Sequence, residues 1–296
     1  MLRIFLLGLI YFLSQNYIYS QNLYSGKVLD AETNESIPFA YVVSPANKML
    51  LAMTNIDGEF EFKNDSDSCM FYCMGYDSLC VSLKNKLNTI KLTPKAYKID
   101  QAIITASAAN KKTFKRKINV KKVMPWDHII KIYSHARCVE TRLILGNGYI
   151  GQLRKVYVYV TNEGEANSYF RIKIYSNLDG RLGYDITPAN IIAKGRPNRW
   201  IEIDVQKYGI LFPKNGLFLG VEHLEDIRNK SFERKFGVKG NIVETYCGPV
   251  VGGVMSSEYW KREVCFQYST KDNGWYIQNP LWCLPMIGAE VIFYKQ

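Results

Sequence analysis

Two patterns of apolar and polar residues follow one another along the chain. The first pattern consists of short apolar-rich runs with turn residues between them and no helical periodicity; the runs are residues 24–30, 37–43, 50–54, 59–63, 70–73, 79–83, 88–92 and 99–105. Short strands at such spacing are typical of a small antiparallel β-sandwich. Asp57-Gly58 lies between two of these runs and predicts a type I′ hairpin turn with positive φ at both residues. A second turn is predicted at Gly75.

The second pattern begins near Met124. Asp127 is placed to cap a short helix whose apolar face includes Ile129, Ile130 and Ile132. Beyond Arg142, apolar and polar residues alternate with a period of two, which indicates strands with one buried face. These predicted strands are residues 156–160, 170–175, 200–205, 217–222, 242–246, 261–268, 275–278 and 289–294. Together they predict a second and larger β-sandwich that is jelly-roll-like, so the whole fold is expected to be all-β.

The first twenty residues have the order of segments found in a secretory signal peptide. Arg3 gives a positive start, residues 4–13 are apolar, and the polar residues that follow end in the small Ser20. This apolar run is too short to span a bilayer, which needs about 20 residues. The chain is therefore expected to be exported after removal of the signal peptide.

The net charge of +11 is unevenly distributed along the chain. Residues 107–123 carry seven Lys and Arg residues and no acid. We interpret this segment as a solvated, self-repelling linker; the alternative is attraction to an anionic membrane, lipopolysaccharide or acidic glycan. Nucleic acid is not expected as a partner, because no set of aromatic stacking residues accompanies the basic run. The predicted organisation is a signal peptide (1–20), a β-sandwich (21–106), a basic linker (107–123) and a second β-sandwich (124–296).

A series of landmarks occurs in order within the first sandwich: Gly26-Lys27-Val28, Asp30, Ile37-Pro38-Phe39-Ala40, residues 54–60, Gly75-Tyr76, Ile90-Lys91-Leu92 and residues 99–106. Over residues 23–106 this series resembles the carboxypeptidase regulatory-like (transthyretin-like) domain of Bacteroidetes cell-envelope proteins. Members of that family are mostly non-catalytic modules, so the resemblance implies no active site. It also implies a location in the periplasm, or at the outer membrane and cell surface, of a Gram-negative bacterium.

Three stretches of the second half, residues 169–175, 200–204 and 216–222, look like the C-terminal half of uncharacterised Bacteroidetes proteins with the same architecture. That half has the look of a carbohydrate-binding-type sandwich. This second resemblance implies a fold and no activity.

Motifs for catalysis or metal binding are not found in the sequence. Its three histidines are His128, His135 and His223, and the residues after His223 lack the His-x-x-Glu spacing of a metallocarboxypeptidase. Two acidic pairs, Glu222 with Glu225 and Glu202 with Asp204, could serve a glycosidase only across a cleft. We therefore predict no catalytic residue, metal site or cofactor. The alternative is a hydrolase that acts on glycan or peptide through carboxylates that the sequence does not identify.

Seven cysteines are present, and export permits disulfides. Cys73 and Cys80 flank the predicted Gly75 turn and are a candidate cross-strand pair. An odd number of cysteines leaves at least one thiol, and buried thiols are the favoured interpretation.

Aromatic residues cluster in the last fifty residues and form the candidate binding surface: Tyr246, Tyr259, Trp260, Trp275, Tyr276 and Trp282. Exposed Trp and Tyr rings can stack on sugar faces or anchor a protein partner. Packing of the same rings in the core between sheets is the alternative. The predicted function is a non-enzymatic binding or structural module of the cell envelope, with a glycan or an envelope protein as its ligand.

Overall fold

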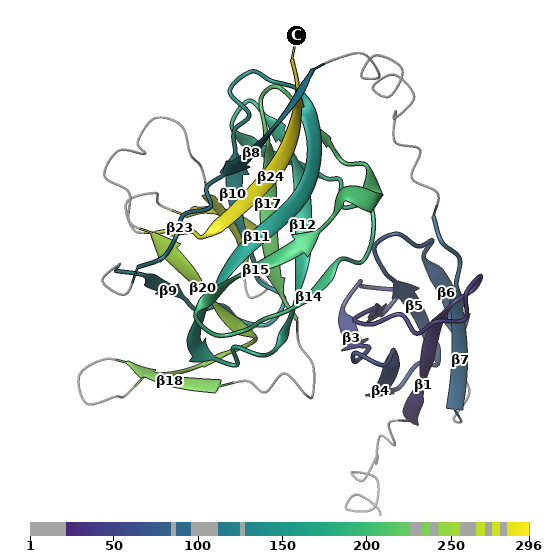
Figure 1. The fold of residues 1–296 in the computed structure, drawn as a ribbon. Helices are drawn as coiled ribbons and strands as arrows, with labels where there is room; N and C mark the ends of the chain where they lie inside the picture. The colour runs from purple at the N-terminus through teal and green to yellow at the C-terminus, as the bar shows by residue number, and fades with distance from the viewer. Residues whose placement is uncertain are drawn as a thin grey trace, which may run out of the picture. The chain divides into compact units, whose positions relative to one another are not determined.

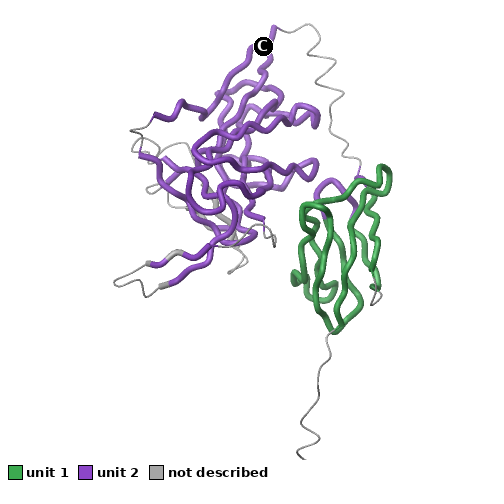
Figure 2. Tube along the Cα trace, turned by 60° about the horizontal axis from the view of Figure 1, so that its bottom comes forward, with its two compact units in different colours: residues 1–72, 78–93 green, residues 73–77, 94–296 purple. Residues whose placement is uncertain are grey.

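The computed structural model describes residues 22–83, 87–95, 112–124, 128–224, 232–236, 242–254, 265–269, 274–278 and 283–295. Apart from one 3-10 turn, η1 (Gln206–Tyr208), these residues form strands and loops, so the predicted all-β fold is confirmed (Figure 1). The chain divides into two compact units, residues 1–72 with 78–93 and residues 73–77 with 94–296 (Figure 2). None of the described segments is a helix with the length and apolarity needed to cross a membrane. The predicted signal peptide and the predicted strand at residues 99–105 lie outside the described residues.

The smaller unit is a sandwich of two sheets. Its strands are β1 (Asn22–Asp30), β2 (Tyr41–Val43), β3 (Leu50–Met53), β4 (Glu59–Asn64), β5 (Ser68–Tyr72), β6 (Leu79–Ser82) and β7 (Leu87–Leu92). One sheet has the order β4-β1-β7 and the other the order β3-β2-β5-β6. β1 runs parallel to β7, and the other strand pairs are antiparallel. The rings of Phe60 and Phe71, one from each sheet, lie 5.1 Å apart in the core between them.

The Asp57-Gly58 turn is present, but it does not join two strands of one sheet. β3 pairs with β2, whereas β4 pairs with β1, so the turn carries the chain from one sheet to the other. Gly58 has a φ of 75°, while Asp57 is not among the residues with positive φ, so the type I′ prediction is wrong. Instead the Gly58 amide donates to the Asn55 carbonyl (3.0 Å), and the Asn55 side chain accepts from the amides of Asp57 and Glu59. The second predicted turn does close an antiparallel pair, because β5 pairs with β6 across Gly75, whose φ is 83°.

The described residues of the larger unit form seventeen strands: β8 (Thr113–Ile118), β9 (Ile130–Ile132), β10 (Val139–Ile144), β11 (Gly151–Gly164), β12 (Tyr169–Leu178), β13 (Arg181–Asp185), β14 (Ile192–Lys194), β15 (Arg199–Asp204), β16 (Leu211–Phe212), β17 (Leu217–His223), β18 (Phe232–Phe236), β19 (Ile242–Tyr246), β20 (Pro249–Val254), β21 (Cys265–Ser269), β22 (Gly274–Gln278), β23 (Leu284–Pro285) and β24 (Ile287–Tyr294). The predicted strands of this half all overlap observed ones. The period-two alternation therefore located the sheets correctly.

Two large sheets enclose the core of this unit. A seven-stranded sheet has the order β13-β12-β17-β10-β21-β22, with β14 beside β12. An eight-stranded sheet has the order β23-β20-β11-β24-β8, with β15 and β16 beside β11 and β9 beside β20. Buried side chains of both sheets pack together, including Ile172 and Leu219 from the first and Val158 and Val291 from the second. β18 and β19 form a separate two-stranded sheet.

Part of the segment predicted as a basic linker is a strand of the larger unit. β8 pairs antiparallel with β24, and Phe114 and Ile118 pack against the core. Lys115 and Lys117 are exposed on this strand. Charged side chains on an edge strand discourage pairing with another chain.

The helix predicted after Asp127 is also wrong. Ile130–Ile132 forms β9, which pairs antiparallel with Val251–Gly253 of β20. Isoleucine is β-branched and suits a strand, and the sheet edge offered by β20 outweighs the weak helical pattern. Asp127 itself lies outside the described residues.

The candidate disulfide is not formed in this structure. Cys73 and Cys80 are free thiols, as are Cys69, Cys138, Cys247 and Cys283. Cys80 is exposed on β6 and lies opposite Met70 in the strand register. Burial raises the pKa of the Cys69 thiol to about 12, with smaller contributions from Cys80 and Asp67, so Cys69 stays protonated at neutral pH.

Gly58→Val is expected to destabilise the smaller unit. A side chain at this position must adopt a φ of 75°, and its Cβ would lie 2.8 Å from the Val28 carbonyl oxygen. Positive φ alone costs a residue of this kind about 1–3 kcal/mol, and the contact with backbone adds to that. Urea unfolding of the full chain measures the loss in the free energy of unfolding.

Gly148→Val is the matched control for this experiment. Gly148 also has positive φ (85°), but nothing lies within 4 Å of a Cβ built there. The Gly148→Val variant therefore introduces backbone strain without a steric contact. Gly58→Val should lower the free energy of unfolding by more than Gly148→Val does. Equal losses in the two variants would mean that the Val28 carbonyl can move away without effect.

Candidate functional site

The predicted aromatic surface is only partly described, and its described members differ in environment. Tyr246 is buried on β19, where its ring stacks on His135 with centroids 5.0 Å apart and also contacts Tyr133. Trp275 on β22 is 40% exposed, and its edge meets the ring of Tyr175 at 5.3 Å. The backbone of Tyr276 lies on β22, and Tyr259, Trp260 and Trp282 lie outside the described residues. Tyr246 and Trp275 belong to different sheets, so they do not form one flat platform.

Of the four acidic residues considered for a hydrolase, Glu222 and Glu202 are engaged in ion pairs, and Asp204 accepts a hydrogen bond from the Gln206 amide at 2.9 Å. Glu222 is buried and accepts a hydrogen bond from Arg171 at 2.9 Å. Glu202 pairs with Lys155, whose hydrogen bond is the main cause of the lowered pKa of the Glu202 carboxyl. Glu225 lies outside the described residues. Among the described residues, no group of three His, Cys, Asp or Glu side chains is arranged to hold a metal ion.

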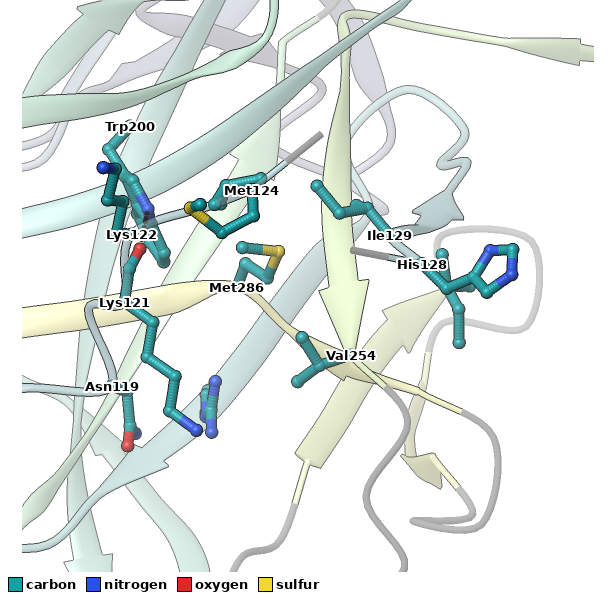
Figure 3. A pocket seen from close by; sticks show the side chains of 12 residues that line it. Asn119, Lys121, Lys122, Met124, His128, Ile129, Trp200, Val254 and Met286 are labelled. Atoms are coloured by element: carbon teal, nitrogen blue, oxygen red, sulfur yellow. Dashed lines mark hydrogen bonds between the residues drawn. The ribbon is translucent and has the colours of Figure 1, made fainter. Parts of the chain in front are cut away.

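A pocket of about 580 Å³ lies in the larger unit, and this volume is typical of small-molecule sites, which span about 300–1,000 Å³. It is built from segments far apart in the sequence. Its lining residues are Asn119, Lys121, Lys122, Val123, Met124, His128, Ile129, Ile130, Arg142, Trp200, Val254 and Met286. Figure 3 shows Trp200, Lys122, Lys121 and Asn119 on one side, Ile129 and His128 on the other, and Met124, Met286 and Val254 between them.

The pocket forms where the hydrogen-bonded neighbour of β11 changes. Residues Gly151–Val158 of β11 pair with β24, and the strand pairs with β20 from Val160 onward. Met286, directly before β24, joins β11 to β20 at this point, because its carbonyl accepts from the Tyr159 amide (3.0 Å) and its amide donates to the Gly252 carbonyl (2.7 Å). A Cβ on Gly252 would lie 2.7 Å from the Tyr159 ring and 3.0 Å from the Met286 sulfur. The glycine therefore allows the wall of the pocket to pack closely.

Trp200 and the segment after β8 form one wall together. Trp200 lies opposite Tyr159 in the strand register, and the two rings meet edge to face at 5.6 Å. The indole Nε1–H of Trp200 donates to the carbonyl of Lys121 at 2.8 Å. This bond fixes the backbone that carries Lys121 and Lys122 against the sheet.

The charges that line the pocket have one sign. Lys121 and Lys122 are exposed, whereas Arg142 is 4% exposed and donates from Nη1 to the Pro285 carbonyl at 3.1 Å. None of the described lining residues is acidic. The pocket therefore combines an apolar surface with positive electrostatic potential, a pairing that favours ligands with a negative charge.

Sequence reasoning did not identify this site. Trp200 was read as one position of an alternating strand, and Lys121 and Lys122 as part of a linker. The basic run is the one feature of the sequence that points to this site. Its position beside Arg142 and Met286 depends on the fold and cannot be derived from the sequence.

His223 is buried in the core, which makes the larger unit sensitive to acid. Burial lowers the pKa of its imidazole to about 4 from the ordinary 6.5. Below pH 6.5 the unfolded chain binds a proton that the folded protein does not bind, so stability is complete above pH 6.5 and falls as the pH drops toward 4. We expect His223 to account for a loss of about 2 kcal/mol in the free energy of unfolding between pH 7 and pH 5.

Urea unfolding at the two pH values measures this loss. His223→Gln should lose correspondingly less stability on acidification than the parent chain. His135→Gln is the control, because it removes an exposed histidine of the same unit and leaves His223 in place. Identical pH dependence in His223→Gln and the parent chain would contradict the assignment.

The comparisons with known proteins give no family for the chain. No protein-family model matches it, and no curated protein matches it either. The resemblance of the first sandwich to the carboxypeptidase regulatory-like domain therefore stays a prediction. What can be said of function rests on the pocket of the larger unit and on its lining residues.

Proposed function

We propose that the chain is an exported, non-enzymatic binding protein of a Gram-negative cell envelope, and that the larger unit holds its ligand in the pocket described above. The observation that carries this proposal is the composition of the lining. Apolar side chains, three cations, Asn119 and His128 surround a volume of about 580 Å³, and none of the described lining residues is acidic. Pockets of this kind, with an apolar lining and few polar groups, are typical ligand sites.

The lining favours binding over the alternative of a hydrolase. A glycosidase of the common type needs two carboxyl groups that face each other across the substrate. Among the carboxylates considered for that role, Glu202 and Glu222 pair with Lys155 and Arg171, and Glu202, Asp204 and Glu222 do not line the pocket. Glu225 lies outside the described residues. The described wall thus offers contacts to a ligand without the acid and base that such a reaction requires.

The smaller unit is proposed to be a carboxypeptidase regulatory-like module. Its support is the sandwich of a three-stranded and a four-stranded sheet, together with the ordered landmarks of the sequence.

Filling the pocket should abolish ligand binding without unfolding the protein. Val254 lines the pocket at the end of β20 and is only partly buried, so Val254→Trp places a large ring in the cavity. The protein is incubated with a small-molecule extract of bacterial envelopes, and bound ligands are detected by native mass spectrometry. The parent chain should carry a ligand that Val254→Trp lacks.

Two further variants make the result specific. Val243→Trp adds the same ring at a position of β19 that is 50% exposed and outside the pocket, so it should keep the ligand. Trp275→Ala removes the exposed described ring of the predicted aromatic surface. Retention of the ligand by Val254→Trp and its loss from Trp275→Ala would move the site to that surface and refute the proposal.

A further inference from the structure

We infer that the ligand of this pocket is a single-chain anionic amphiphile, a molecule with one alkyl chain and a carboxylate or phosphate head group. The inference rests on the proposed function, because it names the ligand class of the same site. It is drawn from the separation of cationic and aliphatic side chains around the pocket.

The cations supply the site for the head group. Lys121 and Lys122 lie next to each other, and the Lys121 carbonyl is held by the indole of Trp200. Arg142 adds a third positive charge from a side chain that is almost completely buried. An ammonium or guanidinium group forms charge-assisted hydrogen bonds with carboxylate and phosphate oxygens, and these bonds are about twice as strong as neutral ones.

The rest of the lining suits an alkyl chain. Met124 and Met286 have flexible thioether side chains that adapt to an irregular apolar ligand. Ile129, Ile130 and Val254 extend the apolar surface, as Figure 3 shows for Ile129 and Val254. Each methylene group that leaves water for such a surface contributes about 0.8 kcal/mol.

A neutral glycan fits this lining less well. A sugar presents hydroxyl groups all round, and burying those that face the Met, Ile and Val side chains of the lining is unfavourable, because these side chains cannot hydrogen-bond them. Trp200 is the only Trp, Tyr or Phe ring among the described lining residues, and its Nε1–H is already bonded to the Lys121 carbonyl.

Isothermal titration calorimetry of the purified full chain tests the ligand class with compounds that share one tail or one head. Dodecanoate and dodecyl phosphate carry the predicted combination. Dodecyl maltoside has the same tail with a neutral head, dodecyltrimethylammonium has a cationic head, and inorganic phosphate has no tail. Used below their micelle concentrations, the two anionic compounds should bind at least about tenfold more tightly than the other three, a difference of about 1.4 kcal/mol.

Charge-reversal variants locate the head group. Lys121→Glu with Lys122→Glu should remove the preference for the anionic compounds. Lys112→Glu with Lys115→Glu makes the same change of charge at exposed positions of the basic segment outside the lining, and it should keep the preference. Ile129→Asn should weaken binding of both anionic compounds through the tail and leave the discrimination between head groups in place.

Several results would overturn the inference. Equal affinity for dodecanoate and dodecyl maltoside would show an apolar pocket indifferent to charge, and equal affinity for phosphate and dodecyl phosphate would show an anion site without a tail groove. Equal weakening by the two charge-reversal pairs would mean general electrostatic attraction. None of these results affects the proposed function, which fails separately if Val254→Trp retains the envelope ligand and Trp275→Ala loses it.

Discussion

The larger unit depends on the backbone hydrogen bonds of one strand, β11, which has neighbours along both edges. Its 14 residues pair with β24 and then β20 on one edge, and with β16 and then β15 on the other. Its inward side chains, such as Val156 and Val158, are completely buried. Burying a side chain of this size contributes about 1.5–3 kcal/mol, whereas an exposed ion pair such as Lys155–Glu202 contributes about 0–1 kcal/mol. Apolar burial along β11 therefore outweighs the surface charges.

The pocket lies beside the same strand, at the point where its hydrogen-bonded neighbour changes. The edge of β11 is paired first by β24 and then by β20, and Met286, directly before β24, lies at this change of neighbour, where it bonds to Tyr159 of β11 and to Gly252 of β20. Tyr159, beside this junction, points away from the core and is covered by Trp200. The segments after β8 and before β9 then complete the lining. The pocket thus lies beside a change of strand neighbour, and the segment between β8 and β9 supplies many of its lining residues.

Sequence patterns predicted the strands well, because each strand is indicated by the alternation of apolar and polar residues within its own segment. They failed where the outcome depends on distant partners. Leu153 and Val156 are both buried although three residues apart, because a register shift between Leu153 and Lys155 changes which residues face inward. Likewise, nothing within residues 50–63 shows that β3 and β4 belong to different sheets, because the sheet of each strand is set by its pairing partner, β2 for β3 and β1 for β4. The site was unpredictable for the same reason, because its walls come from strands that meet only in the fold.

The sequence allowed two interpretations of the basic segment, a solvated linker or an anion-binding surface. The structure shows that its lysines lie in different environments. On β8, Lys117 lies opposite Glu290 in the strand register and 4.9 Å from the centre of the Tyr157 ring, so sheet neighbours compensate its charge. Lys121 and Lys122 follow the strand and line a pocket whose described residues include no acid. Exposed charges more than about 8–10 Å from a ligand are largely screened at physiological salt, so the cations remote from the pocket contribute little to a bound head group. Only the last two lysines of the run, joined by Arg142 from β10, are placed to determine which ligands bind.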